Sequence, residues 1–370
     1  MKIFDVSFTG EFIVKASGDQ PEKVNSLTLS NLDLLSGRFP VTYFYFYPKQ
    51  PNVSFETIFK SLQASLSETL NYFHPFAGQI VTNEASQEEP IIICNNNGAL
   101  LVEARASVDL KSLDFYNLDA LLQSKLVRVN PDFSLQIQAT EFECGGLAIT
   151  FTFDHALGDA SSFGKFLTLW SEISRNQPVS CVPDHRRNLL RARSPPCYDP
   201  HLDKTFIKCS EEDIKNIAMP KTLIKRLNHI DASSIDKLQV LATVNGESRT
   251  KIEAFSAYVW KKMVDSIESG HKTCKMGWLV DGRGRRPALV LSSGRRFPVA
   301  ELDFGFGAPF LGTVCSTVEK IGVGYLNQRP SACNDGSWSV SAIVWPELAE
   351  AFESDSVFQP MSAKHLQLQT

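Results

Sequence analysis

The stretch Leu147–Ile173, with the sequence LAITFTFDHALGDASSFGKFLTLWSEI, changes its hydrophobic period partway along. From Leu147 to Phe153, apolar side chains occupy every second position, which is the period of a β-strand. From Phe163 to Ile173 they recur three or four positions apart, which is the period of an amphipathic α-helix. We therefore expect a buried strand that passes through a short turn into a helix.

The turn between this strand and this helix holds two chemically useful side chains, His155 and Asp159. An imidazole with an ordinary pKa near ~6.5 can accept a proton at cytosolic pH. On local sequence alone, however, a structural histidine and an aspartate that caps the helix are the commoner roles. Asp159 could also orient His155 as in a catalytic triad, although a turn this short favours an Asp159 that points back into the scaffold.

Strand-like and helix-like segments alternate through the rest of the chain. In the first half, the sequence predicts a helix over Ser54–Leu70 and strands at Val41–Tyr47, Ile91–Cys94 and Leu135–Ala139. In the second half, it predicts helices over Glu211–Met219, Asp231–Ala242 and Lys251–Ser266, and strands at Gly277–Val280, Ile321–Leu326 and Trp338–Val344. This alternation predicts an α/β protein.

The segment 176–200 differs in composition from the chain on either side. It holds five of the 19 prolines and four arginines, and its apolar residues show no periodicity, which is typical of a crossover between domains. A chain of 370 residues is also long enough for two domains. We expect an N-terminal domain over residues 1–175, a crossover linker over 176–200 and a C-terminal domain over 201–370.

Composition excludes several classes of protein. With 43% hydrophobic and 21% charged residues the chain is globular, and its net charge of −4 gives no basic surplus for nucleic acid or acidic membranes. The N-terminus carries Asp5 and Glu11 where a signal peptide would be apolar, and no apolar run is long enough to span a membrane. The cysteines form no CxxC pair, so no zinc site is expected, and a disulfide scaffold is not expected in a chain of this length and cysteine density. We expect a cytoplasmic protein.

Nucleotide-binding and serine-hydrolase motifs fail on their details. Gly158 and Gly164 are separated by one residue too many for a phosphate loop, and Phe166 stands where that loop needs a hydroxyl. Gly322-Val323-Gly324 lacks the third glycine of a dinucleotide-binding loop, and no GxSxG elbow occurs.

Two further motifs lie in the second half. Asp303-Phe304-Gly305-Phe306-Gly307, followed by Ala308-Pro309, predicts a constrained turn with close backbone approach. Asp281-Gly282-Arg283 follows an apolar segment and on its own is most often a solvated turn.

His155-x-x-x-Asp159 in mid-chain and Asp303-Phe-Gly-x-Gly307 near the end together resemble the plant BAHD acyl-CoA-dependent acyltransferases. The resemblance covers nearly the whole chain, because further matches occur in that family's order: Leu29-Ser-Asn-Leu-Asp33, Tyr72-Phe-His-Pro-Phe-Ala-Gly78, Glu253-Ala-Phe-Ser-Ala257 with Trp260, Val280-Asp-Gly-Arg283 and Trp338-Ser-Val-Ser341.

The resemblance implies two chloramphenicol-acetyltransferase-like α/β domains with a channel at their interface. It implies that His155 is the general base, and that Asp159 is structural and points toward Arg283. The loop Asp303, Phe304, Gly305, Phe306 and Gly307 would be structural and lie near the coenzyme A side. Acyl-CoA would be a co-substrate rather than a bound cofactor, no metal is implied, and a small-molecule acceptor and a monomer are expected.

Two departures from the family pattern bear on activity. Phe306 stands where the family has Trp, so an indole N–H that could help to stabilise an oxyanion is missing. The segment Gly284–Leu302 is much shorter than its counterpart in the family and looks too short to supply the strands and helix found there. The C-terminal domain is therefore expected to be shortened.

The leading hypothesis is an acyltransferase that moves an acyl group from acyl-CoA to a hydroxyl or amine. The sequence texture is closest to members that acylate phenylpropanoid alcohols. The alternative is a weak or inactive shortened relative that binds a ligand or a partner protein. A thioester hydrolase that uses water at His155 is a third hypothesis.

Overall fold

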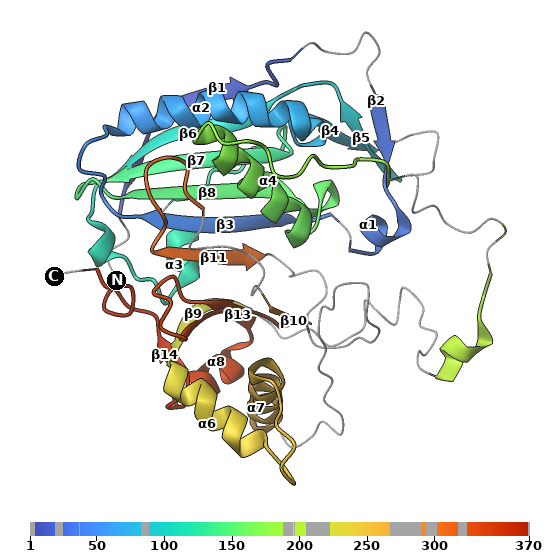
Figure 1. Cartoon of the computed structure of the whole chain (residues 1–370), viewed down its shortest axis with the longest axis vertical. Helices are drawn as coiled ribbons and strands as arrows, with labels where there is room; N and C mark the ends of the chain where they lie inside the picture. The colour runs from blue at the N-terminus through green and yellow to red at the C-terminus, as the bar shows by residue number, and fades with distance from the viewer. Residues whose placement is uncertain are drawn as a thin grey trace.

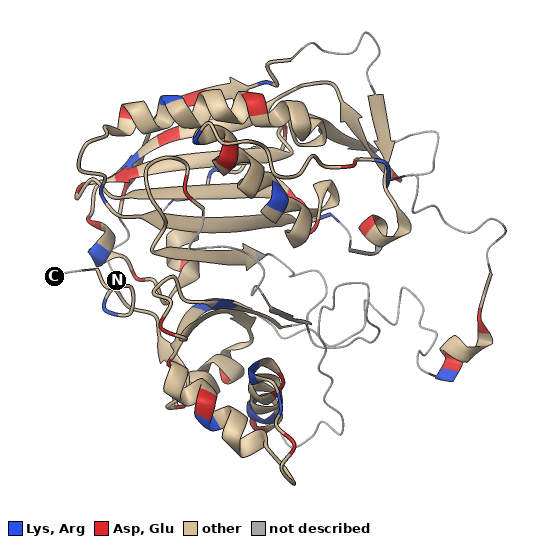
Figure 2. Ribbon diagram, in the orientation of Figure 1, with Lys and Arg blue, Asp and Glu red and all other residues tan. Residues whose placement is uncertain are grey.

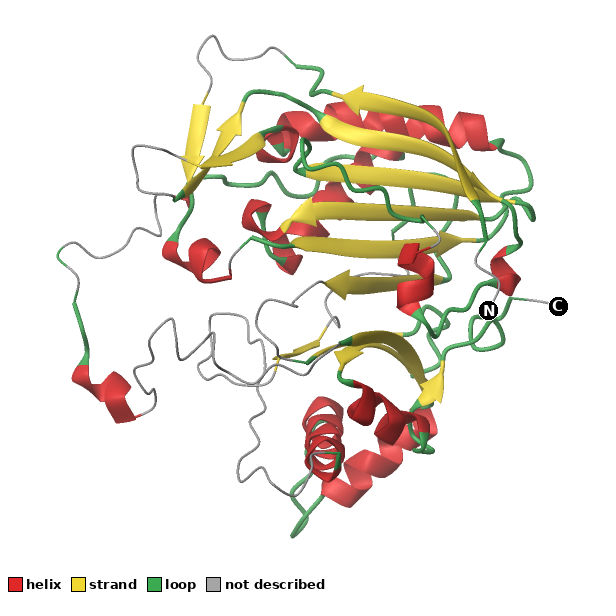
Figure 3. Ribbon diagram, turned by 180° about the vertical axis from the view of Figure 1, so that it is seen from behind, coloured by secondary structure: helices red, strands yellow, loops and turns green. Residues whose placement is uncertain are grey.

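The computed structural model of the chain describes residues 4–18, 25–36, 38–82, 89–123, 125–187, 195, 197–204, 223–266, 290–293, 302–316 and 324–368. They form two α/β layers stacked along the long axis of the molecule (Figures 1 and 3). The larger layer is built on a six-stranded sheet and the smaller on a five-stranded sheet. Acidic and basic residues are interspersed over both layers (Figure 2).

The larger sheet has the strand order β1-β6-β7-β8-β3-β11. All neighbours are antiparallel except the parallel pair β6 and β7. The strands are β1 (Val6–Val14), β3 (Pro40–Tyr47), β6 (Ala99–Ala106), β7 (Leu135–Phe142), β8 (Leu147–Asp154) and β11 (Leu311–Ser316).

Strand β3 is buried on both faces, so its alternating aromatic residues divide between two cores. Tyr43, Tyr45 and Tyr47 join one core together with α2 (Phe55–Tyr72) and α4 (Ala160–Ser174). Phe44 and Phe46 join the core on the opposite face, which includes α3 (Leu118–Gln123). A strand that is buried on both faces typically has a nearly continuous run of apolar and aromatic residues, and β3 has such a run.

A small three-stranded sheet extends the larger layer at one end. It has the order β2-β5-β4, with β2 at Asn25–Thr28, β5 at Pro90–Cys94 and β4 at Gln79–Thr82. Helix α1 (Asn31–Ser36) lies next to it (Figure 1). The short helix η1 (His74–Ala77) leads from α2 into β4.

The smaller layer has the strand order β10-β12-β13-β9-β14. Its strands are β9 (Ile224–Ile230), β10 (Val290–Ser293), β12 (Tyr325–Pro330), β13 (Trp338–Val344) and β14 (Gln359–Pro360). Its helices are α6 (Ala232–Ala242), α7 (Lys251–Asp265) and α8 (Pro346–Glu353), which share its apolar core. Both edge strands are short, which limits the unpaired backbone that each edge presents.

Strand β10 corrects one expectation. The join Gly284–Leu302 does supply a strand, since Val290–Ser293 pairs in parallel with β12. Residues 284–289 and 294–301 lie outside the described residues, so the expected shortening of the second domain stays a prediction.

One segment from the second half of the chain packs with the larger layer. Leu302, Phe304, Phe306 and Val314 belong to the core under α2 and α4, and β11 pairs with β3. The division into residues 1–175 and 201–370 therefore needs an exception, because the stretch from Leu302 to the end of β11 packs with the first sheet. The division itself stays a prediction.

Most of the predicted elements are present, and the rest lie on residues that are not described. The strands at β3, β5, β7, β8 and β13 and the helices α2, α4, α6 and α7 are confirmed. Of the strand expected at Ile321–Leu326, residues 321–323 lie outside the described residues, and its last two residues are the start of β12. The expected helix Glu211–Met219, the strand Gly277–Val280 and the Asp281-Gly282-Arg283 motif lie outside the described residues.

Helices α2 and α4 are joined by a buried hydrogen bond, which gives a test of this packing. Trp170 Nε1 donates to Ser65 Oγ at 2.8 Å, and both side chains are buried. We expect Ser65→Ala to lower the free energy of unfolding by ~1–3 kcal/mol, because it leaves a buried donor without a partner. The exposed Ser61 on the same helix is the matched control, and Ser61→Ala should change that free energy by less than ~0.5 kcal/mol. Equal losses in chemical denaturation would contradict this packing.

Candidate functional site

His155 follows directly on the last residue of β8 and begins the short helix η4 (His155–Leu157). The predicted place of this residue at a strand end is confirmed. Its backbone N–H donates to the carbonyl of Phe39 at 3.0 Å, and its ring stacks on the Phe39 ring with centroids 4.6 Å apart and planes 20° apart. The residue before β3 therefore fixes both the main chain and the ring of His155.

Asp154 anchors the same turn from the other side. One carboxylate oxygen, Oδ1, accepts from the backbone N–H of Ala156 at 2.9 Å and caps η4. The other, Oδ2, accepts from Arg38 Nε at 2.9 Å and lies 2.8 Å from Arg38 Nη2. This carboxylate is thus occupied by the backbone and by an arginine, and it does not orient the imidazole.

The environment of His155 favours the neutral imidazole. Burial lowers the pKa of His155 from its ordinary value, while the nearby carboxylates of Asp159, Asp154 and Asp33 oppose that shift. Its Nδ1 is buried and has no hydrogen-bond partner among the described residues. A half-buried imidazole that is neutral at physiological pH is able to accept a proton.

Asp159 is the N-cap of α4. Its Oδ1 accepts from the backbone N–H of Ser162 at 2.8 Å, and the side chain is exposed. The capping role predicted from local sequence is confirmed, and Asp159 makes no hydrogen bond to His155. Arg283, toward which Asp159 was expected to point, lies outside the described residues, so that contact stays a prediction.

The loop at 303–307 is a compact turn organised by its own aspartate. Asp303 Oδ1 accepts from the backbone N–H of Gly305 at 2.7 Å and of Gly307 at 2.8 Å. Both glycines have φ of +96°, a left-handed conformation that other residues adopt at a cost. The predicted constrained turn is confirmed, but the predicted close backbone approach is not, because a Cβ at either glycine would make only ordinary contacts of 3.5 Å or more.

The aromatic residues of this loop pack against the first layer. Phe304 meets Trp170 edge to face at 4.9 Å, and Phe306 meets Tyr47 in the same way at 5.1 Å. The Tyr47 hydroxyl also donates to the carbonyl of Leu302 at 3.1 Å. These contacts hold the loop at the Tyr47 end of β3.

That position removes the oxyanion role considered for the residue at 306. Pro40 pairs with Asp154, so His155 lies at the opposite end of β3 from Tyr47. The strand spans roughly 24 Å at about 3.4 Å per residue. A ring at position 306 therefore cannot reach an oxyanion formed beside His155, and Phe in place of Trp costs packing at most.

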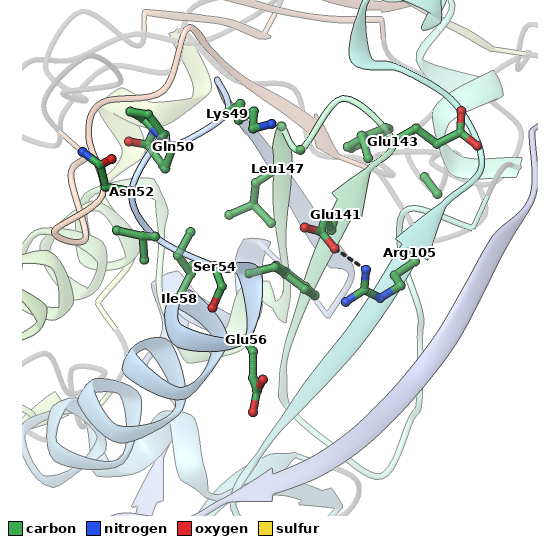
Figure 4. A pocket seen from close by; sticks show the side chains of 17 residues that line it. Lys49, Gln50, Asn52, Ser54, Glu56, Ile58, Arg105, Glu141, Glu143 and Leu147 are labelled. Carbon is green, nitrogen blue, oxygen red and sulfur yellow. Dashed lines mark hydrogen bonds and ion pairs between the residues drawn. The ribbon is translucent and has the colours of Figure 1, made fainter.

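A cavity at the surface of the larger layer also lies away from His155. It has a volume of about 860 Å³ and is lined by the β3–α2 loop, the start of α2 and the β7–β8 turn (Figure 4). Its lining includes Lys49, Arg105 and Leu147, but not His155. Leu147 pairs with Tyr47, so this cavity stands at the Tyr47 end of the sheet. Arg105 is paired with Glu141 there, and we keep His155 as the candidate reactive group.

One contributor to the His155 turn was missed by sequence reasoning. Arg187, which belongs to the crossover, donates to the carbonyls of Ala156 and Leu157 and pairs with Asp33. Asp33 was noted only as part of a motif. No local signal links it to Arg187, since their contact is long-range.

Two kinds of feature are absent from the described residues. No group of three or more His, Cys, Asp or Glu side chains within the described ranges could hold a metal ion. None of the helices that the structure describes is long and apolar enough to cross a membrane.

Comparison with known proteins agrees with this fold. The sequence profile of the Transferase family matches residues 4–288. Vinorine synthase of Rauvolfia serpentina is 28% identical over 269 residues, which cover 69% of this chain and 59% of that protein. Omega-hydroxypalmitate O-feruloyl transferase of Arabidopsis thaliana is 27% identical over 346 residues, which cover 87% of this chain and 72% of that protein.

Solved structures show the same architecture. The crystal structure of vinorine synthase superimposes with a TM-score of 0.71 at 18% identity, covering 94% of this chain and 96% of that one. F. graminearum TRI101 in complex with coenzyme A and deoxynivalenol gives a TM-score of 0.68 at 14% identity, covering 90% and 99%. The two-domain, chloramphenicol-acetyltransferase-like α/β fold is confirmed.

The cap at Asp159 predicts a difference between two substitutions. Asp159→Ala should lower the free energy of unfolding by about 1 kcal/mol, because Ala cannot accept from the Ser162 N–H. Asp159→Asn should stay within ~0.5 kcal/mol of the wild type, because Asn is an equally good cap. Urea unfolding of both variants measures this. A loss of several kcal/mol in Asp159→Asn would instead support a strong charged partner such as Arg283.

Proposed function

Because the chain belongs to the Transferase family, the family of the BAHD acyltransferases, we propose that it transfers an acyl group from acyl-CoA to a hydroxyl of a small molecule. His155 is the general base in this proposal. The observation that carries it is the position of His155 at the end of β8, half-buried and favoured in its neutral form. An amine acceptor would use the same chemistry.

His155 Nε2 takes the proton from the acceptor hydroxyl as its oxygen attacks the thioester carbonyl carbon. The tetrahedral intermediate collapses, the carbon–sulfur bond breaks, and the imidazolium returns its proton to the leaving thiolate. The products are an ester and free coenzyme A. Nε2 is assigned this role because Nδ1 is enclosed, and an accepting Nε2 requires that Nδ1 carry the hydrogen.

The names of the relatives and the sequence support several finer features of the proposal. One relative is named for feruloyl transfer to a hydroxy acid, and a fold neighbour was solved with coenzyme A bound. These support an acyl-CoA donor and a small hydroxylated acceptor, with a phenylpropanoid alcohol as the first class to test. A channel between the two layers, a monomeric state and a cytoplasmic location complete the proposal.

The general-base role predicts a large and specific loss. His155→Ala should lower kcat by roughly 10²–10⁴-fold, which is the usual contribution of a general base. The thermal unfolding midpoint should remain close to that of the wild type. The control is His201→Ala, because His201 is exposed and pairs with the neighbouring Asp199, away from the His155 turn in sequence. A folded His155→Ala protein that keeps near-full turnover would contradict the general-base role of His155.

The lowered pKa of His155 predicts the pH dependence of the reaction. The base must be neutral to accept a proton, so kcat/KM should rise with pH and level off above the pKa of His155. Burial lowers the pKa of His155, so the midpoint of this rise, the acid limb of the kcat/KM profile, should lie below the ordinary histidine pKa of ~6.5. Because the Asp159 carboxylate raises the pKa of His155, Asp159→Asn should move the limb to lower pH. A limb above 6.5 in the wild type, or a shift to higher pH in the variant, would contradict this account.

A further inference from the structure

One side chain of the crossover, that of Arg187, contacts the turn that holds His155. Its Nη1 donates to the carbonyl of Ala156 at 2.9 Å, and its Nη2 donates to the carbonyl of Leu157. Nη1 also lies 3.1 Å from Oδ2 of Asp33 on α1. The Arg187 side chain is only 17% exposed, so these bonds are largely shielded from water. One guanidinium thus joins the crossover, η4 and α1.

The turn needs these donors. Helix η4 is only three residues long, and it ends where the Gly158 N–H donates to the His155 carbonyl at 3.2 Å. A turn this short leaves its later carbonyls without intrahelical partners. The planar fork of a guanidinium can serve two adjacent carbonyls at once, which a lysine ammonium cannot do with the same geometry.

Asp33 fixes the other side of the guanidinium. Its Oδ2 accepts from the backbone N–H and the hydroxyl of Ser30, each at 2.8 Å, and so caps the start of α1. In Figure 1 the crossover leaves α4 and runs toward the end of the layer where α1 lies. A second crossover contact holds it there, because His185 Nε2 lies 2.8 Å from the carbonyl of Tyr72.

We infer that Arg187 is a positioning residue for His155: it immobilises the two carbonyls that follow the imidazole and so keeps the ring stacked on Phe39. The inference rests on the proposed role of His155 as the base. It assigns the crossover a function beyond connecting the two layers.

The arrangement also has an electrostatic consequence. Among the described residues, the charged groups around His155 are Asp154 of β8, Asp159 of α4, Asp33 of α1, Arg38 and Arg187. The Asp33 carboxylate raises the pKa of His155, and Arg187 is paired with that carboxylate. Without Arg187, the Asp33 charge acts on the imidazole unopposed, so the pKa of His155 should rise.

The experiment compares two adjacent arginines. Arg187→Met should lower kcat by ~10–100-fold, because small displacements of a reacting group have effects of that size, while KM for acyl-CoA stays within about two-fold. Arg186→Met is the matched control and should keep kcat within about two-fold, since Arg186 is 71% exposed and bonds only to Asp184 among the described residues. Equal turnover in the two variants would overturn the inference.

Three readouts separate positioning from a general loss of structure. Millimolar methylguanidinium should restore part of the kcat of Arg187→Ala and none of that of His155→Ala. The acid limb of kcat/KM in Arg187→Met should move to higher pH. The ring signals of His155 in an NMR titration should show the same upward shift. An unmoved His155 titration in a folded Arg187→Met protein would also overturn the inference.

Two further experiments distinguish a folding defect from a loss of positioning, and failure of the proposed function from failure of this inference. If Arg187→Met does not fold, Arg187→Lys keeps the charge beside Asp33 but loses the double donation, and it should show a lower kcat with an unshifted pH limb. Absence of turnover in the wild type would refute the proposed function and leave the NMR arm to decide the contacts. Turnover in the wild type with unchanged kinetics in Arg187→Met and Arg187→Lys would refute only this inference.

Discussion

The antiparallel pairing of β3 with β8 is the constraint on which the rest of the molecule depends. Both faces of β3 are covered, with tyrosines in one core and phenylalanines in the other, so a slip by one residue would exchange the two sets. The register sets Pro40 opposite Asp154 and Tyr47 opposite Leu147. It therefore fixes the His155 turn at one end of the sheet, and the 303–307 loop and the large cavity at the other.

The sequence predicted those elements whose burial follows a simple period. The alternation before His155 and the helical spacing after it gave β8 and α4, and the helix over α7 begins with a full capping box at Thr250 and Glu253. Strand β9 was missed because Lys225, Asn228 and His229 are buried in it, which hides its apolar alternation. Strand β1 was missed because most of its residues are exposed, so one buried face is hardly visible in its sequence.

The candidate site was predicted only in part, for a different reason. A motif identifies residues that occur together in sequences, but it does not say that they meet in space. His155 and Asp159 are neighbours because a short turn joins them, whereas the Asp303 loop serves the packing of Trp170 and Tyr47 at the far end of β3. Arg187 carries no motif at all, since its partners come from segments more than 25 positions away in the chain.

The central claim is that this chain passes an acyl group from a thioester to an acceptor rather than to water. The most direct measurement incubates the purified chain with a panel of CoA thioesters and a mixed pool of alcohols and amines, and quantifies free coenzyme A and acylated products by mass. The account predicts that coenzyme A and one acylated acceptor appear in equal amounts. Coenzyme A released together with only the free acid, or no release from any thioester of the panel, would contradict it.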